Sequence, residues 1–368
     1  LPVTLDLVVP LKAKPAVQIK VALNAQGVEL DMPDMNLELR RLTGTFVFDN
    51  QRGLSAKKVT GQFLGQAFTG DIEAQGRAGQ LRTHIDVRGL MPLDKLNQWA
   101  NISQALPVSG TLPYRLRLLL EDEDSQLRVD SSLLGVAIDL PAPFGKTASQ
   151  ESYADWRMTL AGQERRYWLD YADQVSLSLA AAPDDILAGR GQLRLGGGLA
   201  RLPTQKGLRV VGRLHQLDLE RWQALLQRYT VPEQEGMQFL HSAKLDIRRM
   251  QGFGLDIANL KVDMRPQRQG WQLELESQQL KGRISDLGAG QPLQLKLAHL
   301  RLPAAHKTQE TAQDALADFD PHSIPALNIQ VDSVFMGDTH LGALALHARP
   351  QAYGVLFDQL NISLKGLN

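Results

Sequence analysis

The chain contains no cysteine among its 368 residues. This absence excludes a scaffold built on disulfides and any metal site with cysteine ligands. The chain also carries no excess charge, because 40 Lys and Arg residues balance 40 Asp and Glu residues. A polyanion would meet no overall attractive field, so we expect no nucleic-acid partner.

Long apolar runs are absent as well. No stretch reaches the roughly 20 apolar residues that a membrane-spanning helix needs. The chain begins at Leu1 without a Met, a basic segment or an apolar leader. We therefore expect it to be a piece of a longer protein whose targeting or anchoring segment lies outside it.

Patterns typical of catalytic sites are missing too. Residues 144–147 (Phe-Gly-Lys-Thr) end like a phosphate-binding loop, but Leu140 stands where that motif needs its first glycine. The eight histidines form no His-x-x-x-His or Glu-x-x-His pair, and no serine sits in a Gly-x-Ser-x-Gly elbow. We expect no enzyme, no catalytic residue, no metal site and no cofactor.

What the chain does have is a repeated alternation of apolar and polar residues. Strict alternation is typical of strands with one apolar and one polar face. In residues 112–120 we expect Arg115 and Arg117 to point to water. We expect the alternating apolar residues to point inward: Leu112, Tyr114, Leu116, Leu118 and Leu120. The alternating apolar positions that we single out are Leu112, Tyr114, Leu116, Leu118, Leu134, Val136, Ile138, Val262, Leu273 and Leu275.

Helical patterns are scarce. One covers residues 93–99 and a second covers residues 218–229, and each opens near an aspartate (Asp94, Asp218) suited to a helix start. Turn residues separate the other segments. We predict a mainly β fold: an elongated, curved, largely antiparallel sheet that forms a repeating groove, with a few short helices.

A phrase recurs late in the chain. A strand pattern runs into Arg265-Pro266-Gln267, and a second runs into Arg349-Pro350-Gln351, 84 residues later. A glycine and another strand pattern follow both copies. Self-similarity at a long period indicates an architecture built by repetition. We expect both prolines to close equivalent strands, because proline cannot donate to a sheet.

The helices and loops suggest three successive groove segments. The first, residues 1–100, ends in a short helix. The second, residues 101–230, carries a loop at 141–155 and a helix near 218–229. The third, residues 231–368, carries a loop at 303–325.

Alternation alone does not decide what the apolar faces do. In a closed sandwich, two such faces pack on one another and become core. In an open, curved sheet they line a trough, and an aliphatic trough gains about 0.8 kcal/mol for each CH₂ group of an acyl chain that it covers.

Several phrases resemble a known family. They are residues 110–114 (Gly-Thr-Leu-Pro-Tyr), 140–146 (Leu-Pro-Ala-Pro-Phe-Gly-Lys), 47–56 (Val-Phe-Asp-Asn, then Gly-Leu-Ser-Ala) and 217–222 (Leu-Asp-Leu-Glu-Arg-Trp). In order and over most of the chain, they are similar to the YhdP branch of the AsmA-like bacterial envelope proteins. The phrase at 140–146 is the most specific of them.

The resemblance implies a function. Family members resemble bridge-like lipid transfer proteins, anchored in the inner membrane and extending through the periplasm of Gram-negative bacteria as a β-groove with a hydrophobic interior. The resemblance implies that the ten alternating apolar residues, from Leu112 to Leu275, line a groove for phospholipid acyl chains, and that the protein catalyses no reaction. It also implies an inner-membrane anchor in the full-length protein and an outer-membrane partner.

An alternative hypothesis assigns the protein to another functional class, that of structural or assembly scaffolds. The same strands could close into β-sandwich units that scaffold envelope assembly and bind protein partners at exposed strand edges. The two hypotheses differ in one observable: the apolar face is open to solvent in a lipid groove and closed in a sandwich scaffold.

Overall fold

A computed structural model describes the chain except for residues 1–2, 9–16, 34–35, 78–79, 103–105, 230–238, 253, 268–269, 289, 303–325, 352–353 and 365–368. The secondary structure is 69% strand and 7% helix, so the predicted mainly β class is confirmed. The chain divides into two compact units. Unit 1 comprises Leu1–Gly191 and Gly198–Gln205, and unit 2 comprises Gln192–Gly197 and Lys206–Asn368.

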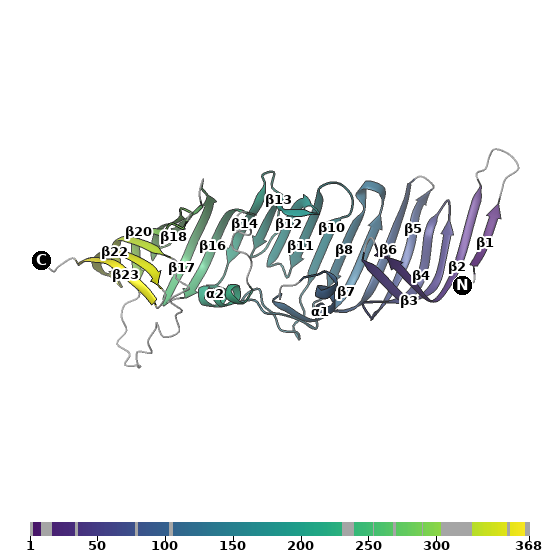
Figure 1. The fold of residues 1–368 in the computed structure, drawn as a ribbon, viewed down its shortest axis with the longest axis horizontal. Coiled ribbons are helices and arrows are strands. Elements are labelled where there is room, and N and C mark those ends of the chain that lie inside the picture. The colour runs from purple at the N-terminus through teal and green to yellow at the C-terminus, as the bar shows by residue number, and fades with distance from the viewer. Residues whose placement is uncertain are drawn as a thin grey trace. The chain divides into compact units, whose positions relative to one another are not determined.

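Unit 1 is an antiparallel meander (Figure 1). Strands β1 to β8 pair in chain order, and β8, β10, β11 and β12 continue the pairing. The short β9 instead pairs with the first residues of β7. The strands are β1 (Val3–Val8), β2 (Gln18–Met32), β3 (Leu37–Asp49), β4 (Gly53–Phe63), β5 (Gln66–Arg77), β6 (Gln80–Pro92), β7 (Val108–Leu120), β8 (Gln126–Ser131), β9 (Val136–Ile138), β10 (Ala154–Thr159), β11 (Arg165–Tyr171), β12 (Val175–Ala182) and β13 (Asp185–Leu195), which ends in unit 2.

Unit 2 mixes antiparallel and parallel pairs. Strands β14 and β15 run parallel to β16, and β20 runs parallel to β21, while the remaining pairs are antiparallel. The strands are β14 (Gly207–Leu214), β15 (Leu217–Asp218), β16 (Leu240–Gly252), β17 (Leu255–Pro266), β18 (Trp271–Glu276), β19 (Leu280–Asp286), β20 (Leu293–Leu302), β21 (Leu327–Met336), β22 (Thr339–Gln351) and β23 (Gly354–Leu364). Parallel neighbours need a long crossover, and a long chain segment precedes both β16 and β21.

Both predicted α-helices are present. Helix α1 spans Leu93–Trp99 and α2 spans Leu219–Arg228. The side chain of Asp218 caps α2 by accepting a hydrogen bond from the Arg221 N–H at 3.0 Å, whereas Asp94 lies within the first turn of α1. A short 3₁₀ helix (Asp122–Asp124) joins β7 to β8.

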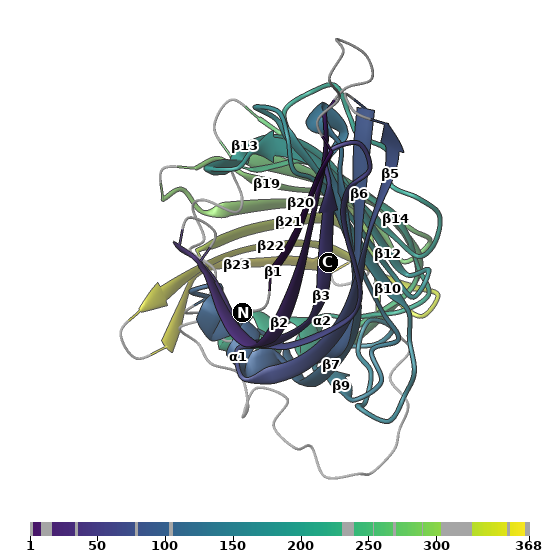
Figure 2. The same cartoon turned by 90° about the vertical axis from the view of Figure 1, so that its right-hand side faces the viewer.

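The sheet of unit 1 is curved. Figure 2 looks along the direction in which its strands are stacked and shows them bending along their length, with α1 at the lower edge. The predicted loop at 141–155 ends two residues early, because β10 begins at Ala154, and its residues 141–153 contain no strand beyond one isolated bridge at Lys146. The predicted loop at 303–325 lies outside the described residues.

The 84-residue repeat is confirmed in unit 2. Ala243 pairs with Met264, and Leu327 pairs with Ala348, each 84 residues later. At the strand ends, Pro266 pairs with Trp271, and the same offset gives Pro350 and Val355. Strand β17 ends at Pro266, and β22 ends one residue after its proline, as expected for a residue that closes a strand.

Each unit has its own buried core. In unit 1, Leu42, Ala56, Val59 and Phe68 form a cluster on β3 to β5. In unit 2, two pairs of buried side chains fall on equivalent repeat positions: Ile247 and Val331 are 2% and 1% exposed, and Met250 and Val334 are both 9% exposed. The repeat is therefore one of packing as well as of sequence.

Candidate functional site

Strand β7 carries apolar side chains on one side of the sheet. Leu112, Tyr114, Leu116 and Leu118 alternate along it, and all four are half-buried. The strand register places apolar residues of the neighbouring strands beside them. We define the apolar face of unit 1 by Ile85, Val87, Leu112, Tyr114, Leu116, Leu118, Leu127, Val129, Trp156, Met158, Tyr167 and Leu169.

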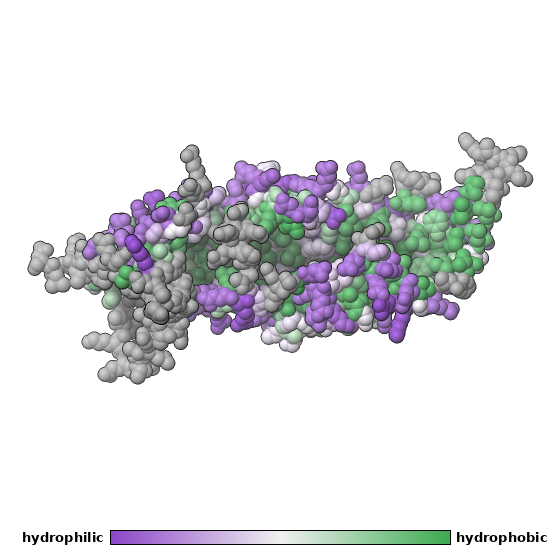
Figure 3. Space-filling model, in the orientation of Figure 1, coloured by the Kyte–Doolittle hydropathy of each residue, from purple (hydrophilic) through white to green (hydrophobic). Residues whose placement is uncertain are grey.

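This apolar face keeps part of its surface in contact with solvent. Every residue that defines it is half-buried, whereas side chains closed between two layers would be buried. Figure 3 shows apolar (green) side chains along a hollowed face over the strands of unit 1, with polar (purple) side chains at its edges. The geometry of unit 1 is that of an open trough floor.

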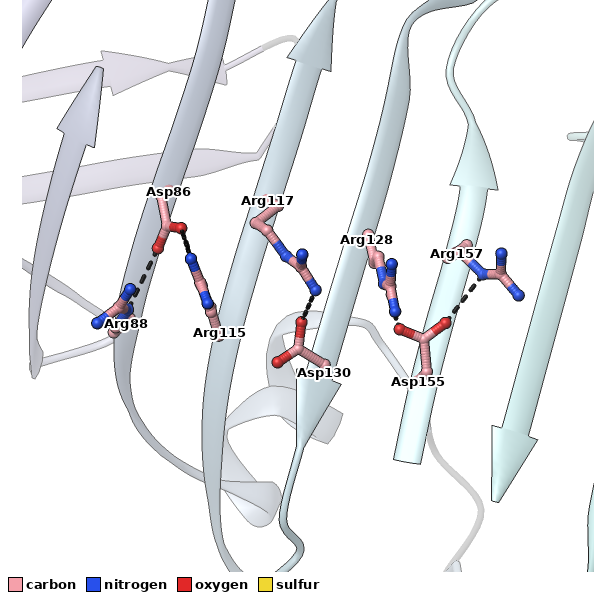
Figure 4. Close-up of polar contacts among 8 residues, drawn as sticks. All are labelled: Asp86, Arg88, Arg115, Arg117, Arg128, Asp130, Asp155 and Arg157. Carbon is pink, nitrogen blue, oxygen red and sulfur yellow. Dashed lines mark hydrogen bonds and ion pairs between the residues drawn. The ribbon is translucent and has the colours of Figure 1, made fainter. Parts of the chain in front are cut away.

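The opposite side of the same strands is the polar face. Figure 4 shows its arginines and aspartates on β6, β7, β8 and β10. Arg115 and Arg117 lie here, as predicted, away from Leu116. Arg115 donates to Asp86 at 2.5 Å, and Arg117 donates to Asp130. Burial of the Asp86 carboxyl opposes its ionisation, but the hydrogen bond and charge of Arg115 outweigh burial and lower the Asp86 pKa.

Asp155 on β10 is the most buried acid of this polar face. Its side chain is 5% exposed and lies between two guanidinium groups. Arg128 donates to one carboxylate oxygen, and the Nε atom of Arg157 lies 2.9 Å from the other. Burying an unpaired carboxylate would cost free energy, so the two arginines stabilise the charged Asp155 side chain in its buried position.

Unit 2 separates its side chains in the same way. Val262, Leu273 and Leu275 are half-buried and lie on one side, and the register sets Val262 beside Leu275 and Leu273 beside Ile284. The other side carries charges of both signs. A depression of about 830 Å³ lies there, with Lys244, Lys261, Asp263, Glu274, Arg283 and Lys296 among its lining residues.

Three of the predicted positions lie apart from the open face. Leu134 is in the turn between β8 and β9 and is 53% exposed. Val136 and Ile138 lie on β9, which pairs with β7 at Ser109 and its neighbours. Val136 is 2% exposed, so its side chain is part of the interior and does not lie on the open floor.

Residues 140–146 build a compact loop beside β9. Phe144 is 5% exposed, and its carbonyl oxygen accepts a hydrogen bond from the Tyr171 hydroxyl at 3.0 Å. The Lys146 ammonium donates to the carbonyl of Leu133 at 2.8 Å and to that of Val136. Gly145 is required, because a Cβ there would lie 2.1 Å from the Leu140 carbonyl oxygen. The lysine of this phrase is thus used to hold the loop.

Sequence reasoning did not single out the aromatic part of the floor. Trp156 on β10, and Tyr167 on β11, lie on the apolar face and are half-buried. The signal was present on β10, where apolar and polar residues alternate from Asp155 to Met158. The strand is only six residues long, and on β11 the apolar Trp168 between Tyr167 and Leu169 breaks the alternation.

Within the part of the chain that the structure describes, no group of three or more His, Asp or Glu residues could hold a metal ion. Among the same residues, no helix combines the length and the apolar character needed to cross a membrane.

Comparison with known proteins identifies the family. Neither curated proteins nor solved structures gave a match. The family model described as YhdP protein matches residues 1–368, which is the whole chain. With the mainly β fold and the two-faced strands, this match shows that the chain belongs to the YhdP family.

Proposed function

We propose that the apolar faces of this chain bind the acyl chains of phospholipids. The observation that carries the proposal is the half-buried apolar face of unit 1, from Ile85 to Leu169, opposite a face of arginines and aspartates. A lipid tail that covers this floor gains about 0.8 kcal/mol for each CH₂ group removed from water. The polar face offers no such gain, so tails are directed to one side.

The separation of the two faces supports a trough and not a sandwich. A sandwich would place a second layer over Val87, Leu116 and Trp156, and their side chains would then be buried. In the part of the chain that the structure describes, no second layer buries them, and all three side chains are half-buried. Val262 and Leu275 give unit 2 the same character.

The setting of this activity is also proposed. Within a longer, inner-membrane-anchored protein, the chain would serve as a periplasmic segment that conducts phospholipid between the inner and outer membranes of a Gram-negative bacterium. Partners would be the lipid, the anchor and an outer-membrane component. Conduction along a passive apolar surface needs no reacting group, so we propose a non-enzymatic role.

Site-specific photocrosslinking tests the proposal. A photoreactive residue at Leu116 should crosslink to phospholipid, and the same residue at His84 on the polar face should not. Val262 and its neighbour Lys261 form the matched pair for unit 2. His84 and Lys261 are exposed, so both controls are accessible to lipid.

Charged substitutions test the same surface. Leu116→Asp and Val262→Asp would place an unpartnered carboxylate against acyl chains, which costs several kcal/mol unless the group reaches water. Both variants should stay folded by circular dichroism and lose the lipid crosslink. Variants that unfold, or a wild-type protein that never crosslinks, would support the closed scaffold that binds partners at strand edges.

A further inference from the structure

Glycine and aromatic residues alternate in one row across four strands of unit 1. Gly61 on β4 faces Phe68 on β5, Phe68 faces Gly89 on β6, and Gly89 faces Tyr114 on β7. Tyr114 belongs to the apolar face, so the row runs from the buried cluster around Phe68 onto the floor. Glycine in a strand interior weakens the strand, and it often marks a close approach of another group.

The rings occupy the space above the glycines. A Cβ atom on Gly89 would lie 2.8 Å from the Tyr114 hydroxyl oxygen and 3.1 Å from its Cε1 atom. A Cβ atom on Gly61 would lie 2.7 Å from the Cζ atom of Phe68. Neither glycine has the positive φ that would by itself explain it. The two glycines are therefore needed for the rings that lie across them.

Each ring lies flat over the neighbouring strand and does not stand up from the sheet. Phe68 is 8% exposed and packs in the cluster with Leu42 and Val59. Tyr114 is half-buried, and burial raises its pKa, as expected for a hydroxyl held close to the backbone of β6.

We infer that Gly89 is a specificity-determining residue of the apolar floor: by letting the Tyr114 ring lie flat, it keeps the trough deep enough for lipids with two acyl chains. This inference rests on the proposed function. It adds that the floor favours lipids with two acyl chains over lipids with one, and that the clearance above Gly89 makes this selection.

The width of the floor fits two chains. Along β6 the half-buried residues of the floor side run from Ile85 to Gly89, which is roughly 14 Å at about 3.4 Å for each residue. Two acyl chains lying side by side, with their carbon atoms about 4 Å apart at van der Waals contact, fit within this width. Depth is then the limiting dimension, and a Tyr114 ring raised by an added methyl group would obstruct the middle of the floor.

A crosslinking comparison tests the inference. A photoreactive residue at Leu116, next to the row, is exposed to vesicles of diacyl phosphatidylethanolamine or to micelles of the single-chain lysolipid. Gly89→Ala should lower the ratio of diacyl to single-chain crosslinking about tenfold, the effect of one methylene in an apolar site. Thr69→Val, on the opposite face of β5, is the matched control and should leave the ratio unchanged.

Removing the ring tests the same idea from the other side. Tyr114→Ala creates no clash and lowers the floor, so it should raise the ratio above wild type even if Gly89→Ala does not fold. The double variant should recover the wild-type ratio or exceed it. In a stability cycle without lipid, Gly89→Ala should destabilise the wild type more than it destabilises Tyr114→Ala, in which the Ala67 carbonyl oxygen, 3.1 Å away, still crowds the added Cβ.

The outcomes separate the two proposals. A wild-type protein that crosslinks both lipids, with a ratio that Gly89→Ala and Tyr114→Ala leave unchanged, would overturn the specificity inference alone. An equal loss of both lipids in Gly89→Ala, without recovery in the double variant, would also overturn it. A wild-type protein that crosslinks neither lipid would overturn the proposed function and this inference with it.

Discussion

Trp99 and Asn36 hold each other by a reciprocal pair of hydrogen bonds. The indole Nε1 of Trp99 donates to the carbonyl oxygen of Asn36 at 2.6 Å, and the Asn36 Nδ2 donates to the carbonyl oxygen of Trp99 at 3.4 Å. The Trp99 ring also meets Phe63 edge-on, with centroids 5.5 Å apart. Because Trp99 ends α1 and Asn36 lies in the turn before β3, the pair fastens the helix to the strand ends of unit 1.

Replacing this tryptophan should loosen α1. Trp99→Phe keeps a ring against Phe63 and loses the indole N–H, so we expect a loss of about 1 kcal/mol in the free energy of unfolding. Trp99→Ala removes the ring as well and should cost more. Urea denaturation measures both. Equal stability of wild type and Trp99→Ala would show that α1 is not fastened here.

The buried acid on β10 should dominate the stability of the polar face. Asp155→Asn leaves Arg128 and Arg157 facing a neutral amide, and we expect a loss of about 3 kcal/mol, at the lower end for a broken buried pair because both arginines are 40% exposed. Asp256→Asn, in an exposed pair with Arg249, is the control and should leave the denaturation midpoint almost unchanged. If the two variants behaved alike, burial of Asp155 would not matter.

The pKa of Asp86 gives a prediction about acid stability. Arg115 holds this pKa below the ordinary value, so the pair stabilises the folded state above the unfolded-state pKa of about 3.9. That stability is lost as the pH falls through the lower, folded-state pKa. Arg115→Gln should raise the Asp86 pKa and make stability less dependent on pH below about pH 4. Carboxyl-carbon NMR titration measures it directly, and an unchanged Asp86 pKa would contradict the assignment.

Equivalent positions of the repeat should respond alike. Ile247→Ala and Val331→Ala each leave a cavity at a site that is at most 2% exposed, and each should cost about 2 to 4 kcal/mol. Gln330→Ala, on the exposed side of the same strand as Val331, should cost little. Equilibrium unfolding tests the pair. A cost below about 1 kcal/mol at either buried site would mean that the repeat in packing does not extend to energetics.

The alternation of β7 was enough to predict its two faces. Apolar residues at every second position from Leu112 to Leu118, with Arg115 and Arg117 between them, leave one register that puts the apolar side chains on one face and the arginines in water. The Arg-Pro-Gln repeat likewise predicted equivalent strand ends. Both signals are local, or repeat in sequence, and need no knowledge of long-range pairing.

Residues 134–138 show where local signals fail. Their alternation resembles that of β7, but Leu133 and Gly135 adopt positive φ values of 52° and 90°, which end β8 and turn the chain back toward the start of β7. Leu134 is left outside, and Val136 enters the interior. Three alternating residues cannot reveal which strand they pair with.

The parallel pairs and the glycine–ring row were equally beyond reach. A parallel partner for β16 or β21 depends on what the intervening segment does, and alternation reads the same in either direction. The contact between Gly89 and Tyr114 depends on the register of two strands that are joined through α1. Composition shows only that both residues exist.

The half-buried floor of unit 1 has a practical consequence for anyone who handles the protein. A surface that is favourable toward any aliphatic solute will take up whatever amphiphile is most abundant, including the detergent used for extraction. A bound molecule also stabilises the folded state in proportion to the logarithm of its concentration. The melting temperature would then depend on which amphiphiles the sample had met during purification. The molecule recovered from a preparation would reflect the composition of the buffer more than that of the cell.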